Sequence, residues 1–132
     1  SGSGQIVKAC NNMMLGINMI GVSEAFTLAS KYGISQKTFF EISSRSSGSS
    51  WAMLNHLPIK GIVKTAAANN RFKPGYAAKL ILKDLSIAKQ MAKKISLNIF
   101  MGNKAYDLYK SFCRKDKNNL DYSAIIKSLF RK

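Results

Sequence analysis

Acidic residues are scarce in this chain. Six Asp and Glu stand against 21 Lys and Arg, so the net charge is +15 over 132 residues. These six acidic residues are scattered along the chain, so we find no pair of carboxylates that could form a catalytic site. The cations could suit a nucleic acid or an anionic membrane, but they are spread along the chain, which is typical of solvated helix faces. We therefore expect neither nucleic acid nor membrane as a partner.

Cysteine and proline are also rare, with two of each. Cys10 and Cys113 stand alone, outside any ligand spacing, so we predict no metal site. Each follows an apolar residue in a largely apolar segment, which predicts buried thiols in a reducing compartment. Two prolines exclude a long disordered linker. No signal peptide is legible, and we expect a cytoplasmic protein, or one of the mitochondrial matrix if the source is eukaryotic.

No run of alternating β-branched residues is present, whereas helical periodicity recurs throughout. We predict an all-α domain over residues 1–132, a helical bundle around a long central helix. The expected helices cover residues 5–32, 35–42, 76–95, 99–113 and 121–130. The first is apolar nearly all round, so we expect the other helices to enclose it. Polar residues interrupt it too often for a membrane span. Gly33 should end it, and Ser35 and Asp121 should cap the helices that they precede.

Lys8 is the candidate catalytic residue. It lies near the start of a helix that has no other cation before Lys31 at its far end, and burial would make its ammonium group lose a proton more easily. Such a lysine can act as a general acid or base. Asn12 lies one turn further along the same face and could hold a substrate oxygen beside the amine. The alternative is that Lys8 extends to solvent at the helix end.

Lys83 and Asp84 lie in the middle of a predicted helix. Lys83 could reach a phosphate or a nicotinamide, and Asp84 could orient a neighbouring group, although spacing alone favours a solvated pair. His56, the only histidine, lies in an irregular segment and is interpreted as a surface or turn residue.

Three segments together resemble the β-hydroxyacid dehydrogenase family. Residues 2–12 (GSGQIVKACNN) resemble its G-x-G-x-x-x-K-x-x-x-N segment, and residues 68–88 (ANNRFKPGYAAKLILKDLSIA) resemble its second signature, ending in K-D-L. Residues 46–51 (SSGSSW) resemble a segment of the 3-hydroxyisobutyrate dehydrogenase branch. The resemblance implies a fold similar to the C-terminal domain of 6-phosphogluconate dehydrogenase. The family's P-V-P-G turn is replaced here by residues 57–61 (LPIKG), and Tyr76 stands where Phe is common.

The resemblance implies a role for each matched residue. Lys8 would be the general acid/base, Asn12, Tyr76 and Asp84 would bind the substrate, and Lys83 would bind the cofactor. It implies a C-terminal helical domain that carries the substrate and dimerisation surfaces. It also implies that an N-terminal Rossmann domain, absent from this chain, binds most of the NAD, with NADP as an alternative. The fragment alone should be inactive, and a homo-oligomer is expected.

The implied reaction is oxidation of 3-hydroxyisobutyrate, or a similar small hydroxy acid, to the semialdehyde, as in valine degradation. One alternative is a reductase of tartronate or succinic semialdehyde. Another, from a different class, is a non-catalytic basic helical interaction module.

Overall fold

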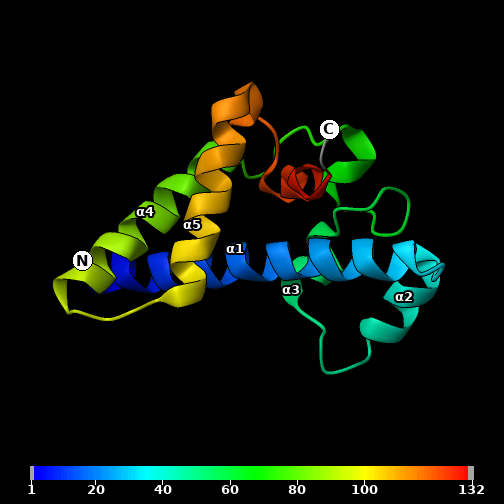
Figure 1. The fold of residues 1–132 in the computed structure, drawn as a ribbon, viewed down its shortest axis with the longest axis horizontal. Coiled ribbons are helices and arrows are strands. Elements are labelled where there is room, and N and C mark those ends of the chain that lie inside the picture. The colour runs from blue at the N-terminus through cyan, green and yellow to red at the C-terminus, as the bar shows by residue number, and fades with distance from the viewer. Residues whose placement is uncertain (1, 131–132) are drawn as a thin grey trace.

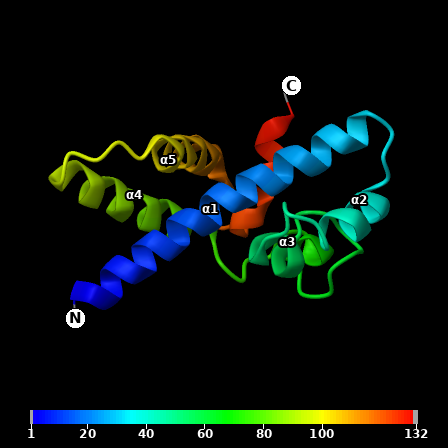
Figure 2. The same ribbon diagram turned by 90° about the horizontal axis from the view of Figure 1, so that it is seen from below.

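Helix α1 (Gly2–Lys31) is the axis on which the rest of the chain is arranged (Figure 1). In the computed structural model, which describes residues 2–130, this helix spans about 45 Å. Helices α4 (Ala78–Lys94) and α5 (Phe100–Phe112) lie along its N-terminal half, and α2 (Gln36–Ser43) and α3 (Trp51–His56) lie along its C-terminal half (Figure 2).

Three short helical segments complete the all-α fold. They are the 3₁₀ helix η1 (Ala67–Asn70), the π-helical turn η2 (Cys113–Lys117) and the 3₁₀ helix η3 (Tyr122–Leu129). Within residues 2–130 the only β-type pairing is an isolated bridge between Ala77 and Asp121. The predicted all-α class is confirmed.

The ends of the helices follow local side-chain chemistry. Gly33 has a φ of +89°, which glycine adopts without strain, and it ends α1 as predicted. The Ser35 hydroxyl accepts a hydrogen bond from the Thr38 N–H at 3.1 Å, and the Asp121 carboxylate accepts one from the Ser123 N–H at 3.1 Å. The predicted caps are confirmed, but η3 is a 3₁₀ rather than an α-helix, and α3, which Ser50 caps, was not predicted as a helix.

The core has two parts. In the larger one, α1, α4, α5 and η3 meet around Met19, Ile81, Leu85, Tyr109 and Tyr122, each at most 1% exposed. In the smaller one, α1 packs on α2 and α3 through Phe26, Met53 and Leu57, and the Phe26 and Phe39 rings meet edge to face at 4.7 Å between centroids. Helix α1 contributes to both clusters, and so does α3, through Ala52 in the larger and Met53 in the smaller.

The prediction that α1 is enclosed is wrong. Val7 is 67% exposed and Leu28 62% exposed, because shorter helices cover only parts of a 30-residue helix. By length and composition α1 could cross a membrane, with a mean hydropathy of 1.3 over its best 18 residues, but core helices of soluble proteins pass the same test.

An apolar groove of about 660 Å³ lies on one uncovered face of α1. We call it the α1–α4 groove, and its apolar lining includes Ile6, Cys10, Met13, Ile87, Met91, Ile95 and Leu97. The thiol of Cys10 is exposed there, and Cys113 is half-buried. The predicted burial of both cysteines is therefore wrong for Cys10, which lies on the uncovered side of its helix.

Candidate functional site

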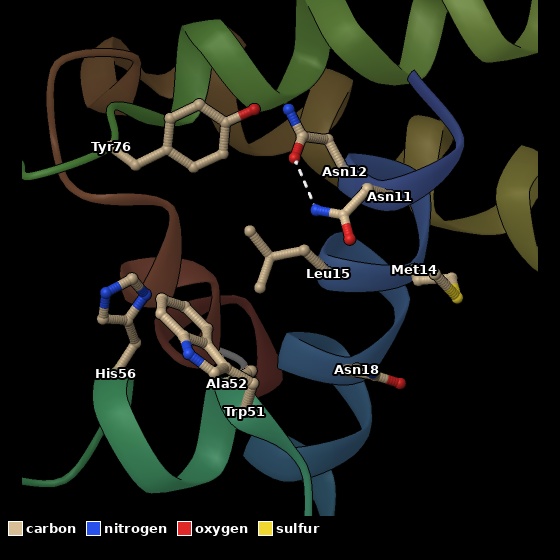
Figure 3. Close-up of a pocket in the computed structure, with 9 residues that line it drawn as sticks. All are labelled: Asn11, Asn12, Met14, Leu15, Asn18, Trp51, Ala52, His56 and Tyr76. Atoms are coloured by element: carbon tan, nitrogen blue, oxygen red, sulfur yellow. Dashed lines mark hydrogen bonds between the residues drawn. The ribbon is translucent and has the colours of Figure 1, made fainter. Parts of the chain in front are cut away.

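A cavity of about 700 Å³, which we call the α1–α3 cavity, opens between α1, α3 and the start of α4. Its lining combines amides with aromatic rings (Figure 3). The lining residues are Asn11, Asn12, Met14, Leu15, Asn18, Trp51, Ala52, His56 and Tyr76.

Helical spacing connects Lys8 to this cavity. Lys8, Asn12 and Leu15 are three or four positions apart, so they share one face of α1. Lys8 is exposed in this structure, so the described residues do not provide the burial of its ammonium group that we expected from the sequence. The reason is that no element of residues 2–130 covers α1 at its first two turns on this side.

Asp84 joins α1 to α4 at the edge of the cavity. It is only 5% exposed, and its Oδ2 atom accepts a hydrogen bond from the Asn12 Nδ2 atom at 2.9 Å. The same oxygen accepts a hydrogen bond from the Tyr76 hydroxyl. The solvated Lys83–Asp84 pair favoured by spacing alone is thus wrong for Asp84, which is a buried carboxylate held by two neutral donors.

Tyr76 and Asn12 are oriented by these bonds. Burial, and then the hydrogen bond to Asp84, raise the pKa of the Tyr76 phenol well above its usual range, so the phenol stays protonated and acts as the donor. The amide oxygen of Asn12 accepts from the Asn11 Nδ2 atom at 3.3 Å (Figure 3). The structure therefore brings three of the predicted site residues, Asn12, Tyr76 and Asp84, into one hydrogen-bonded group.

A second buried carboxylate fixes the backbone beneath Tyr76. The Oδ1 atom of Asp121 accepts hydrogen bonds from the N–H groups of Gly75 and Tyr76, each at 3.0 Å. The N–H of Tyr122 in turn donates to the carbonyl oxygen of Tyr76 at 2.7 Å. The start of α4 is thereby tied to the start of η3, which sets the position of the Tyr76 ring.

His56 was misjudged from the sequence. It lies half-buried at the end of α3, where its Nδ1 atom is 2.7 Å from the Tyr122 hydroxyl and its ring meets Trp51 edge to face at 4.7 Å between centroids. Desolvation lowers the pKa of His56, although Asp121 partly opposes this shift. Burial therefore favours the neutral imidazole, whose Nδ1 atom shares a hydrogen bond with the Tyr122 hydroxyl. The Tyr122 contact joins residues 66 positions apart, which no local pattern predicts.

Asn11 and Asn18 also line the cavity and were not among the predicted site residues. Asn11 is three residues from Lys8, and Asn18 is seven residues from Asn11, so helical spacing could have placed both near that face. Lys83 is exposed on α4, because consecutive helical residues point about 100° apart and Asp84 takes the inward direction. Its free side chain could meet an anionic or amide group presented from outside these residues.

Two comparisons of sequence bear on this site. A family model described as NAD-binding of NADP-dependent 3-hydroxyisobutyrate dehydrogenase matches residues 2–129. A probable 3-hydroxyisobutyrate dehydrogenase of Mycobacterium tuberculosis is 39% identical over 129 residues, which are 98% of this chain and 44% of that protein. The mitochondrial 3-hydroxyisobutyrate dehydrogenase of Drosophila melanogaster is 41% identical over 94% of this chain and 38% of its own length. The chain thus spans less than half the length of these relatives.

Solved structures agree with the sequences. The structure of the Mycobacterium tuberculosis 3-hydroxyisobutyrate dehydrogenase with L-serine superposes with a TM-score of 0.95 at 38% identity, over 99% of this chain and 45% of that one. A 3-hydroxyisobutyrate dehydrogenase from Salmonella typhimurium superposes with a TM-score of 0.80 at 22% identity, over 94% of this chain and 41% of that one, and shares the fold.

Proposed function

The chain belongs to the 3-hydroxyisobutyrate dehydrogenase family, as its C-terminal helical domain, and we propose that it serves the oxidation of 3-hydroxyisobutyrate, or a similar small β-hydroxy acid, to the semialdehyde. The observation that carries the proposal is the group of Asn12, Tyr76 and Asp84 at the cavity edge, one helical turn from Lys8. Such a group can hold a small polar substrate against an amine.

Lys8 is the proposed general base. Oxidation of a hydroxyl carbon removes the O–H proton, and a lysine amine close to the substrate can accept it, typically for a gain of about 10²–10⁴ in rate. Asn12 would position the substrate oxygen beside this amine, and Asp84 would hold the Asn12 amide in place. In the complete enzyme a second domain would cover Lys8 and supply the low-dielectric surroundings that favour its neutral form.

A nicotinamide cofactor, NAD or NADP, supplies the hydride acceptor when bound. The described residues fit only part of it: Lys83 would contact it, but residues 2–130 contain no βαβ unit for its dinucleotide. We propose that an N-terminal Rossmann domain provides that surface. The 132-residue chain alone should then show no dehydrogenase turnover, and sizeable NAD-dependent turnover by it would refute this division of labour.

The test is a nicotinamide-reduction assay on the complete polypeptide with 3-hydroxyisobutyrate. Lys8→Ala should lower kcat/KM by about 10²–10⁴ while the circular dichroism spectrum is unchanged. Lys79→Ala is the matched control, because Lys79 is an exposed lysine on α4 that does not line the cavity. If the parent is active and Lys8→Ala is not impaired, the reaction class survives and the role of Lys8 does not.

We also propose a homo-oligomer located in the cytoplasm or, in a eukaryote, in the mitochondrial matrix. The mitochondrial name of the Drosophila relative supports the second location.

The uncovered α1–α4 groove supports an oligomer, because contiguous exposed apolar surface commonly marks an interface. Size-exclusion chromatography with light scattering would decide, and a monomer at micromolar concentration would contradict the proposal.

A further inference from the structure

We propose that the hydroxyl group of Tyr76 determines specificity, making the α1–α3 cavity prefer 3-hydroxy acids that carry a hydrogen-bond donor at C2 over those with a methyl group there. The donor would be a hydroxyl or an ammonium group. This inference rests on the proposed function, because it concerns the substrate of that same site.

The first argument concerns which atoms are left to face a ligand. Asn12 donates one of its two Nδ2 protons to Asp84, and its amide oxygen already accepts from Asn11, so Asn12 can still offer a donor and does not set the polarity of this wall. The single hydroxyl proton of Tyr76 is committed to the same carboxylate. The lone pairs of the phenol oxygen therefore remain, and Tyr76 can serve a ligand only as an acceptor.

The second argument concerns charge. Asp84 is 5% exposed, and both groups bonded to its Oδ2 atom are neutral, so they do not balance its negative charge. A cationic donor placed beside Tyr76 would lie close to that carboxylate and be stabilised by it. An ammonium group at C2 should consequently gain more than a hydroxyl group.

The third argument concerns the alternative substrate. A methyl group against the same wall would remove water from the Tyr76 oxygen without replacing the lost hydrogen bond. Leaving a desolvated polar group unpaired is costly, so a site built for a donor discriminates against the analogue that lacks it. Removal of the phenol hydroxyl should reverse this discrimination.

Three probes differ only in the group at C2: glycerate carries a hydroxyl, serine an ammonium and 3-hydroxyisobutyrate a methyl group. The measurement is kcat/KM for each probe with the complete polypeptide and nicotinamide cofactor. The expected wild-type order places serine and glycerate above 3-hydroxyisobutyrate. In Tyr76→Phe, the ratio of each donor-bearing probe to 3-hydroxyisobutyrate should fall by about tenfold, the scale of one hydrogen bond to a charged or polar group.

The matched control is Tyr32→Phe, which removes the same hydroxyl from a residue that is 82% exposed and directly follows the C-terminal end of α1. It should leave the ratios unchanged. A second variant, Asp84→Asn, retains an acceptor for Tyr76 but removes the charge, and should lower the serine ratio more than the glycerate ratio.

The outcomes separate the two proposals. If the wild-type enzyme has a higher kcat/KM for 3-hydroxyisobutyrate than for serine and glycerate, the inference is overturned and the proposed function stands. Unchanged ratios in folded Tyr76→Phe overturn it as well. If Tyr76→Phe does not fold, the inference is still tested by two results. These are the order of kcat/KM for the three probes in the wild-type enzyme and the selective loss of serine turnover in Asp84→Asn. Turnover of none of the three probes refutes the proposed function itself.

Discussion

On one face of α1, Asn12 and Leu15 line the α1–α3 cavity, whereas on the opposite face Ile6, Cys10 and Met13 line the α1–α4 groove. The two hollows have similar volumes, about 700 and 660 Å³. They differ in how their walls are held. Hydrogen bonds between distant segments fix the cavity wall, while the groove has apolar side chains that are partly open to solvent.

The polar face of α1 is therefore the more constrained of the two. Asn12 and Asp84 are 72 positions apart, and their bond is made only when α4 docks on α1. A partly exposed apolar side chain has little to lose when it is changed, because it never left water completely. Substitutions on the cavity side should therefore cost more stability than substitutions on the groove side.

The largest effect is expected for Asp84→Leu. The change leaves the Asn12 amide and the Tyr76 hydroxyl without their acceptor, and it should lower the free energy of unfolding by about 3 kcal/mol. Urea denaturation of the chain would measure it. Asp107→Leu, on the exposed side of α5, is the control and should change stability by less than about 0.5 kcal/mol. Equal losses in both variants would contradict the view that Asp84 organises the cavity.

The next effect is a pH dependence that belongs to the cavity side. Desolvation lowers the pKa of His56 in the folded chain below its ordinary value of 6.5, so folding favours the neutral ring. The stability that this provides is complete above pH 6.5 and is lost as the pH falls through the folded-state pKa. His56→Gln should flatten the stability profile between pH 7 and pH 5, as followed by urea midpoints. A profile that keeps its slope in the variant would assign the dependence to other groups.

A smaller effect is expected on the groove side. Ile6 is 51% exposed, so Ile6→Ser in the 132-residue chain should change the free energy of unfolding by less than about 0.5 kcal/mol. The same substitution in the complete polypeptide tests whether something covers the groove there. A loss well above 1 kcal/mol in the isolated chain would mean that the groove is already closed, and the contrast between the two faces would fail.

The smallest perturbation is chemical labelling of the thiols. Cys10 is exposed in the groove, whereas burial raises the pKa of Cys113 and lowers its thiolate fraction. A thiol reagent at pH 8 should therefore modify Cys10 faster by about tenfold or more, with little change in the circular dichroism spectrum. Mass spectrometry of quenched samples would measure both rates, and protection of Cys10 would show that the groove is covered in solution.

Much of the fold could be predicted from local patterns. Gly33, Ser35 and Asp121 marked helix boundaries correctly, because turn conformation and capping depend on a few neighbouring residues. The burial of individual residues could not be predicted in the same way. Lys8 and Cys10 belong to an apolar helix, yet both are exposed, because exposure depends on where the shorter helices end.

Helical periodicity was sufficient to predict the all-α class, the long first helix and the shared face of Lys8 and Asn12, since it assigns residues to faces. Which groups meet on those faces depends on the tertiary packing. It placed the Asp84 carboxylate between Asn12 and Tyr76, and it joined His56 to Tyr122 across 66 residues. The physical reason is that a buried polar group must find a partner, and the partner is chosen by how helices pack rather than by how residues are spaced.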